Sequence, residues 1–336
     1  MLNNCSICGH RRIISALQKN IRQDRLAHAY LFSGPEAVGK KTVALNFVKT
    51  LQCEGREKPC GMCQTCFQIE KNIHPDTIIF QKDITGDSKG GQEIKIFEMR
   101  DIQKKMSLKQ YSAPYKILLL DRAENLNDEA ANSLLKFLEE PKGKTLIILI
   151  TNNINMVLPT IISRCVTINF LLVPKNEMLK YFERKVEALQ SKTYGAQNLN
   201  LEEIINYSLG RPGNVIRWLE NPKDFIESKE IVKNFAKVVL ADNITEKFKF
   251  ISQFYNKKEE SIKLLMHLLM FYQHLLSWQI GREDLEDDKE IRQFARRYEI
   301  NKIRNALFQI ISAKKFILQN ANLKLVLENM MLNIGH

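Results

Sequence analysis

The chain has 336 residues, a length too great for one ordinary core, so we expect two or three domains. Its 44% hydrophobic and 26% charged residues are the balance of a soluble globular protein, and its polar start, MLNNCSICGHRR, excludes a signal peptide. We therefore expect a cytoplasmic protein without a membrane partner. The net charge of +12 favours a polyanionic partner such as DNA, although the excess is spread along the chain.

Short apolar runs alternate with helix-periodic segments over the first half of the chain. Strands are predicted at 27–33, 116–121, 145–151 and 166–170, and helices at 41–51 and 129–138. This alternation predicts an α/β domain over residues 1–170, with a parallel sheet covered by helices on both faces.

Helical periodicity replaces strand signals after about residue 171. We expect a small helical domain over 171–220 and an all-α bundle over 221–336, separated by the breaker Asn221-Pro222. Residues 264–278 are strongly apolar, but two histidines and a glutamine interrupt them, so a buried core helix is predicted there.

The stretch SGPEAVGKKT, residues 33–42, has the glycine and lysine spacing of a phosphate-binding loop. Its candidate nucleotide-binding residues are Gly34, Gly39, Lys40, Lys41 and Thr42. The pattern requires a hydroxyl directly after Lys40 to hold Mg²⁺, and Lys41 stands there instead; Thr42 is rotated away by about 100°. The loop either binds a nucleotide or keeps only the backbone shape, and the missing hydroxyl argues against ATP binding.

The second nucleotide element is Asp121, at the tip of the strand 116–121. In ATPases of this type a glutamate follows the aspartate and orients the attacking water, whereas this chain has Arg122. Glu124 lies two residues further along. The metal ligand and the base are both missing, so we expect no intrinsic ATP hydrolysis.

Four cysteines follow the first of these helices in the spacing C-x6-C-x2-C-x2-C: Cys53, Cys60, Cys63 and Cys66. Clustered thiolates in a reducing compartment predict a closed, structural Zn²⁺ site, with a set of reduced thiols as the alternative. Arg164, in Ser163-Arg164-Cys165, precedes the strand 166–170. It is either a surface charge or a catalytic arginine finger presented to a neighbouring subunit.

With these residues in hand, the chain closely resembles the delta-prime family of bacterial DNA polymerase III clamp-loader subunits, which are AAA+ proteins. The resemblance runs nearly end to end and is carried by AHAYLF, the loop, the cysteines with HPD at 74–76, ANSLLKFLEEP at 131–141, SRC at 163–165 and GRPG at 210–213.

This resemblance implies an AAA+ RecA-like domain with a zinc-binding insertion at 53–66, a helical lid and a helical collar. It also implies tau/gamma motor subunits and delta as partners in a pentameric ring that loads the sliding clamp onto primed DNA. Within that ring the chain would be a non-motor stator that supplies Arg164 in trans. Gly213 stands where the motor subunits carry a lid arginine, and Arg211 is displaced from that position.

Two other functions compete with the stator. A tau/gamma-like ATPase motor is disfavoured by Lys41 and Arg122. A stand-alone zinc module that binds nucleic acid is disfavoured by the extensive AAA+ scaffold.

Overall fold

The computed structural model describes residues 7–82, 93–141, 143–189, 200–281, 294–296 and 298–334. Its contacts divide the chain into two compact units. Unit 1 comprises residues 1–181 with 210–213, and unit 2 comprises residues 182–209 with 214–336. The division into domains at 1–170, 171–220 and 221–336 stays a prediction.

Unit 1 is built on a five-stranded parallel sheet with the order β2-β3-β4-β1-β5. The strands are β1 (Ala29–Ser33), β2 (Thr77–Phe80), β3 (Lys116–Leu120), β4 (Thr145–Thr151) and β5 (Val166–Asn169). β1 and β4 run in register, with Ala29 opposite Ile147 and Ser33 opposite Thr151. The predicted parallel sheet is confirmed, and β2 is a strand that the sequence analysis did not identify.

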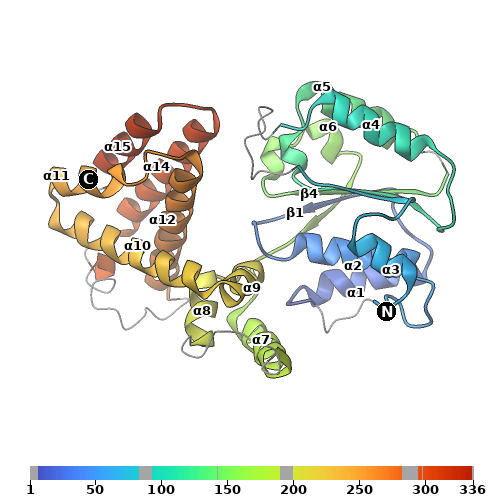
Figure 1. The fold of residues 1–336 in the computed structure, drawn as a ribbon, viewed down its shortest axis with the longest axis horizontal. Helices are drawn as coiled ribbons and strands as arrows, with labels where there is room; N and C mark the ends of the chain where they lie inside the picture. Colours follow the sequence, from blue (N-terminus) through green and yellow to red (C-terminus); the bar gives the residue numbers. More distant parts are fainter. Residues whose placement is uncertain are drawn as a thin grey trace. The chain divides into compact units, whose positions relative to one another are not determined.

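Helices cover both faces of this sheet (Figure 1). On one face lie α1 (Arg11–Arg22), α2 (Lys40–Gln52) and α3 (Gln64–Glu70), and on the other lie α4 (Ile96–Ser107), α5 (Asp128–Glu139) and α6 (Pro159–Ile162). Side chains alternate along the strands: Tyr30 and Phe32 join the core beneath α1 and α2, whereas Leu31 joins the core beneath α4 and α5. The central strands are buried on both faces, which explains their continuous apolar runs.

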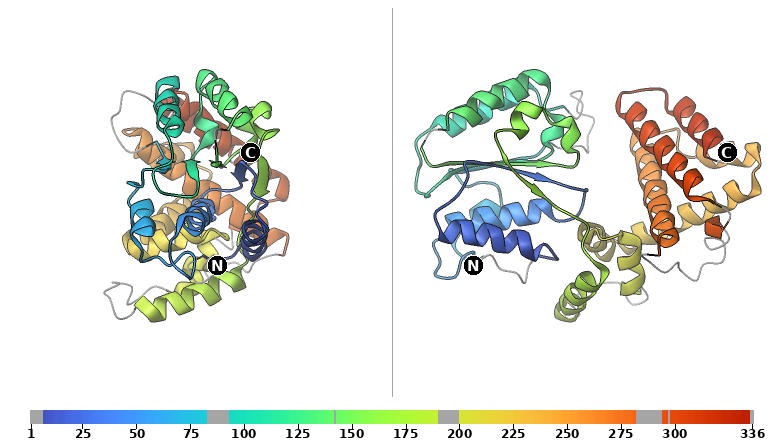
Figure 2. Two further views of the ribbon diagram at one scale, coloured as in Figure 1. Left: turned by 90° about the vertical axis from the view of Figure 1, so that its right-hand side faces the viewer. Right: turned by 180° about the vertical axis from the view of Figure 1, so that it is seen from behind.

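Unit 2 is helical throughout its described residues (Figure 2). It contains most of α7 (Lys175–Leu189), α8 (Leu201–Ser208), most of α9 (Pro212–Glu220), α10 (Pro222–Ala241), α11 (Ile244–Ser252), α12 (Lys258–Gln279), α14 (Ile300–Leu318) and α15 (Leu323–Asn333). α12 packs against α10, α14 and α15.

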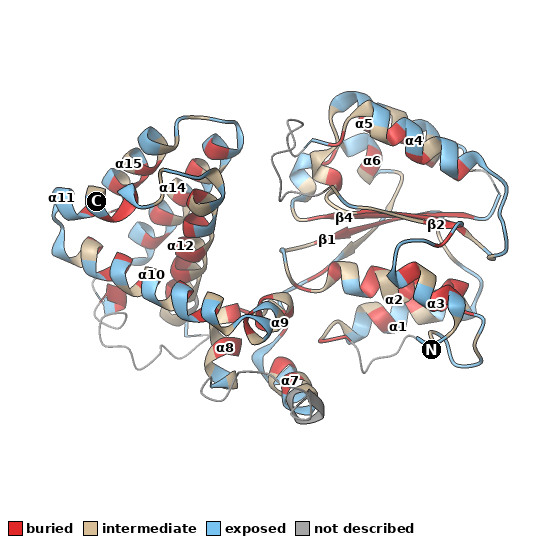
Figure 3. Ribbon diagram, viewed as in Figure 1, coloured by how far each residue is buried: buried red, intermediate tan, exposed pale blue. Residues whose placement is uncertain are grey.

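The apolar run 264–278 lies in α12, and its inward face is buried in the core of unit 2, as the red segments of Figure 3 show. The prediction of a core helix is confirmed. Among the described residues, no helix has the length and apolar character needed to cross a membrane.

Two histidines of unit 2, the buried His267 and the partly exposed His274, have lowered pKa values, from which a pH-dependent stability is expected. Burial lowers the pKa of His267 to about 4, with Lys263 and Arg217 adding to the effect, and burial lowers the pKa of His274 to about 4. Well above pH 6.5 both imidazoles are neutral in the folded and unfolded chain. Between pH 6.5 and 4 the unfolded chain binds protons that the folded chain excludes, so acidification favours unfolding.

We predict that the free energy of unfolding falls between pH 6.5 and 4, by up to about 1.4 kcal/mol per pH unit for each histidine. Urea unfolding of the full chain at several pH values measures this slope. His267→Gln should reduce it, because glutamine does not titrate, whereas the same change at the exposed His28 should not. An equal slope in the wild type and His267→Gln would contradict the assignment.

Candidate functional site

The turn between β1 and α2 has the backbone of a phosphate-binding loop. Gly34 and Gly39 both have positive φ angles, of 149° and 104°. A Cβ atom on Gly34 would lie 2.3 Å from the carbonyl oxygen of Phe170, so glycine is also required there for close packing. Gly39 is the N-cap of α2, and Lys40 is the first residue of that helix. The predicted strand, loop and helix are therefore in place.

Lys40 turns back into this loop and is 4% exposed. Its Nζ donates hydrogen bonds to the carbonyl oxygens of Gly34 (2.7 Å) and Pro35 (2.6 Å) and to Oδ1 of Asn152 (2.9 Å). Burial lowers the pKa of the Lys40 ammonium to about 8, although the nearby carboxylates of Glu124, Asp121 and Glu36 oppose this change. The three donors of the ammonium thus have acceptors within the chain itself.

Lys41 stands where the loop pattern requires a hydroxyl, and its Nζ lies 3.7 Å from Oδ2 of Asp121. The Asp121 side chain is 14% exposed, and its carboxylate is the one expected near a metal ion. Thr42 is exposed on α2 and does not replace the missing hydroxyl. Arg122, in the position of the catalytic glutamate, has a left-handed backbone and pairs with Glu36 at 3.1 Å.

Asn152 connects Lys40 to an acid that the sequence analysis had set aside. Its Nδ2 and its backbone N–H donate to Oε1 of Glu124, at 3.1 and 3.2 Å. Glu124 reaches this position because Ala123–Asn125 form a short 3₁₀ turn after β3. Asn152 follows β4 directly. A polar residue at the end of a buried strand next to β1 is the sequence feature that could have indicated a residue of the loop site.

Residues 210–213 pack onto the same loop within unit 1. The backbone N–H of Gly213 donates to the carbonyl oxygen of Ala37 at 2.8 Å. A Cβ atom on Gly213 would lie 3.0 Å from that oxygen, so a larger residue would press on the loop. Burial lowers the pKa of Arg211, and the carboxylate of Glu36 partly offsets this. Arg211 therefore lies in the electrostatic field of the loop, although it stands two residues before Gly213, the position of the lid arginine in the resemblance.

Arg164 lies between α6 and β5 and does not join the loop residues. Its NH2 lies 2.6 Å from Oε1 of Glu139, and its NH1 donates to the carbonyl oxygen of Thr160 at 3.0 Å. The side chain is 37% exposed.

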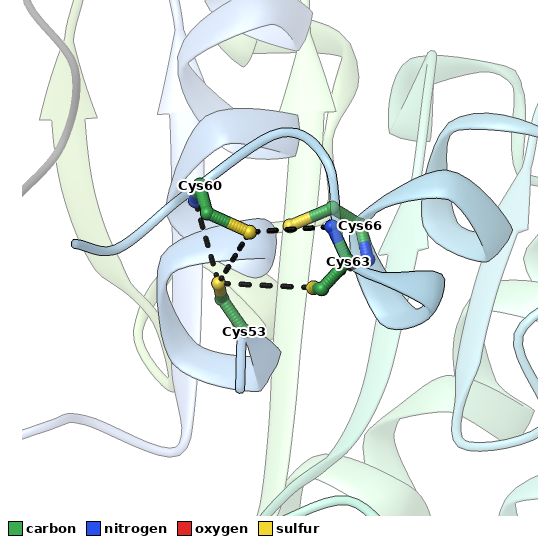
Figure 4. Close-up of side chains that lie close together, drawn as sticks. All are labelled: Cys53, Cys60, Cys63 and Cys66. Carbon is green, nitrogen blue, oxygen red and sulfur yellow. Dashed lines mark hydrogen bonds between the residues drawn. The ribbon is translucent and has the colours of Figure 1, made fainter. Parts of the chain in front are cut away.

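The four cysteines form one cluster that begins at the C-terminal end of α2 (Figure 4). All four Sγ atoms lie within 4.8 Å of one another. Sγ of Cys53 is 3.5 Å from that of Cys60 and 3.9 Å from that of Cys63. The 13 residues of α2 separate the cluster from the phosphate loop by about 20 Å, at about 1.5 Å per residue.

This donor set fits a zinc ion. Four sulfurs at about 2.3 Å from a tetrahedral Zn²⁺ lie about 3.8 Å from one another, close to the observed spacing. Backbone N–H groups point at the sulfurs: Gly55 and Cys60 donate to Cys53, Cys63 donates to Cys60, and Cys66 donates to Cys63. The N–H groups of Met62 and Cys63 lower the pKa of Cys60, whereas burial raises the pKa of Cys66, so the fit to a metal rests on the spacing of the sulfurs.

The sheet, the glycine loop after β1 and the acid at the end of β3 define a parallel α/β protein with a phosphate-type loop and a mostly helical C-terminal part. The model of a family described as "DNA polymerase III, delta subunit" matches residues 9–173. A solved structure of a gamma subunit-related protein from Thermotoga maritima covers 95% of this chain and 98% of its own, with 17% identity and a TM-score of 0.49.

The sequence relatives are more specific. The chain is 32% identical to DNA polymerase III subunit delta' of Bacillus subtilis (strain 168), over 96% of this chain and 94% of that protein. It is 26% identical to DNA polymerase III subunit tau of the same organism, over 80% of this chain and 49% of that protein. The chain belongs to the family of DNA polymerase III delta-prime subunits.

We predict that the purified chain contains about one equivalent of zinc, held by the four cysteines. Replacing Cys60 and Cys63 together by serine should remove the metal and destabilise unit 1, because the cluster connects the end of α2 to the start of α3. Elemental analysis and thermal unfolding measure both effects. Cys165→Ser, outside the cluster, is the control and should retain the metal. A fully folded, metal-free wild type would contradict the zinc assignment.

Proposed function

We propose that the chain is a non-motor subunit of a DNA polymerase III clamp loader. It would assemble with tau/gamma motor subunits and with delta in a pentameric ring, and the ring would place the sliding clamp around primed DNA. Membership of the delta-prime family supports this proposal. The single structural observation that favours a stator over a motor is the Lys41–Asp121 ion pair in the phosphate loop.

That ion pair puts a cation of the chain where Mg²⁺ would be held. Magnesium bound there would have to displace the Lys41 ammonium from Asp121 without gaining a hydroxyl ligand. The adjacent Arg122 carries a positive charge and cannot accept a proton from water. Glu124 accepts two hydrogen bonds from Asn152 through Oε1, and its Oε2 is buried without a hydrogen-bond partner. The loop therefore lacks the metal-binding hydroxyl after Lys40 and a glutamate directly after Asp121, the two groups that hydrolysis in this pattern uses.

A motor subunit of the tau/gamma type is the second candidate, because tau and gamma subunits are also among the relatives. Lys40 retains the phosphate-binding lysine position that a motor would use. The two candidates differ in whether the isolated chain hydrolyses ATP.

We predict no ATP turnover by the isolated chain, with or without DNA and clamp. Lys41→Ser with Arg122→Glu should restore Mg-nucleotide binding before any hydrolysis, because the first change supplies the metal ligand and the second the acid. Phosphate release and nucleotide-binding titrations measure the two effects. Lys40→Ala in the double variant is the control and should abolish the restored binding. Turnover by the unaltered chain that Lys40→Ala removes would support the motor instead.

The proposed stator supplies Arg164 to the nucleotide of a neighbouring subunit. Its guanidinium is partly exposed and carries a fork of N–H donors that matches phosphate oxygens. The chain's own loop contains Lys40 and Lys41, which already have partners within the chain. An arginine finger is therefore useful only to a phosphate bound by another subunit.

The C-terminal helices offer a surface for assembly. Exposed apolar side chains on α14 and α15 include Phe308, Ile311, Leu325 and Leu332, with Phe308 and Leu325 each 65% exposed. Burial of such side chains favours association. These helices support the proposal that residues 221–336 form a collar joining the chain to other subunits.

We predict that Arg164→Ala leaves folding, zinc content and assembly intact but lowers DNA-stimulated ATP turnover and clamp loading by the reconstituted complex. Arginine fingers contribute factors of about 10³–10⁵ at a single active site, so turnover at the neighbouring site should be almost lost. Arg164→Lys should rescue little, because an ammonium lacks the planar fork.

Arg12→Ala, at an exposed arginine of α1, is the control and should have no effect on turnover. A reconstituted Arg164→Ala complex that works at the wild-type rate would make Arg164 an ordinary surface charge.

A further inference from the structure

Arg164 is held from two sides in the folded chain. One terminal nitrogen, NH2, pairs with Oε1 of Glu139 at 2.6 Å, and the other, NH1, donates to the carbonyl oxygen of Thr160 at 3.0 Å. Thr160 belongs to the short helix α6, directly before Arg164, whereas Glu139 belongs to α5, which packs on α6. The guanidinium is thus oriented by a second element of the fold as well as by its own turn.

The position of Glu139 is unfavourable for helix stability. It is the last residue of α5, and Glu140 follows it at the C-cap. A carboxylate at the C-terminal end of a helix faces the negative end of the helix dipole, where a cation would be preferred. The paired Arg164 guanidinium supplies that cation. The Glu139 carboxylate at this position is therefore not explained by the stability of α5, whereas its contact with Arg164 does explain it.

From this geometry we infer that Glu139 is a positioning residue for Arg164, an inference that rests on the proposed arginine finger. An arginine carries five N–H donors. Glu139 and Thr160 each engage one terminal nitrogen of Arg164, and NH1 also makes a longer hydrogen bond to Oγ of Ser163 at 3.5 Å. The remaining donors stay available to a phosphate of the neighbouring subunit. An arginine that is already oriented loses less side-chain entropy when that phosphate arrives than a freely rotating one does.

The size of the effect follows from exposure. The side chains of Arg164 and Glu139 are 37% and 49% exposed, so the pair is partly solvated and its contribution is modest. We expect Glu139→Ala to lower the ATPase kcat at the neighbouring site of the reconstituted complex about three- to fivefold. The KM for ATP should not change, because Arg164 acts on the phosphate in the transition state.

The experiment is a double-mutant cycle in the complete reconstituted complex. It compares wild type, Glu139→Ala, Arg164→Ala and the double variant, with Glu140→Ala as the matched control. Glu140 is the adjacent, exposed acid at the same helix end, and it does not pair with Arg164. If Glu139 acts through Arg164, the double variant should be no slower than Arg164→Ala, and Glu140→Ala should match the wild type.

NMR of the Arg164 guanidinium in the isolated chain gives a readout independent of ATP. Rotation about the bonds from Cζ to the terminal nitrogens should be slow in the wild type and in Glu140→Ala, and faster in Glu139→Ala. Equal thermal unfolding temperatures of these variants would separate positioning from a loss of stability.

The outcomes separate the inference from the proposed function. If Arg164→Ala slows the complex but Glu139→Ala does not, the finger stands and the positioning role is overturned. If Glu139→Ala lowers turnover by the same factor in the wild type and in the Arg164→Ala background, Glu139 has a structural role. If Glu139→Ala alone turns over ATP faster than the wild type, Glu139 competes with the phosphate for Arg164. Either result overturns the inference, and a fully active Arg164→Ala complex overturns both it and the finger.

Discussion

The buried ammonium of Lys40 is the constraint on which the phosphate loop depends. A buried cation without partners would be strongly destabilising, so the surrounding chain must supply acceptors. Two of them are carbonyl oxygens of the loop itself, and the third is Oδ1 of Asn152 at the end of β4. Satisfying Lys40 therefore joins the loop to the strand next to β1, and Asn152 extends the connection to Glu124 after β3.

The same loop also receives residues 210–213 through the hydrogen bond from Gly213 to Ala37. Four separate parts of unit 1 thus meet at this turn, and the ammonium of Lys40 has its acceptors within the chain. A phosphate that used this ammonium would have to replace existing hydrogen bonds, and each buried group left without a partner costs about 1–3 kcal/mol. A phosphate loop can in this way connect separate segments of a domain while it keeps its backbone conformation.

Periodicity and spacing predicted most of the parallel sheet, the helix after the loop and the helical C-terminal part, because buried strands and amphipathic helices have strong local signals. β2 and α4 were not identified: β2 has four residues, which is too short for a clear pattern, and α4 interrupts its apolar stripe with charged side chains. The clustering of the four cysteines could be predicted because they lie close together in the sequence, at the spacing of metal ligands.

The partners of the loop residues were not predictable in this way. Asn152 is 112 positions from Lys40 in the sequence, and the fold alone brings them together. Glu124 was judged too distant along the chain, but the 3₁₀ turn at Ala123–Asn125 redirects its side chain. The pairing of Glu139 with Arg164 depends in the same way on the packing of α5 against α6.

Lys40 and Arg164 show how exposure decides what a cation can do in the same domain. Lys40 is 4% exposed and has short hydrogen bonds to three acceptors, so freeing it would leave buried polar groups without partners. Arg164 is 37% exposed, and its contacts with Glu139 and Thr160 use only part of its five N–H donors. A phosphate from outside the chain can contact this second cation without displacing Glu139, but it would have to displace the partners of the first. The proposed stator function uses this difference, because Lys40 is engaged within its own loop while Arg164 is exposed to a neighbouring subunit.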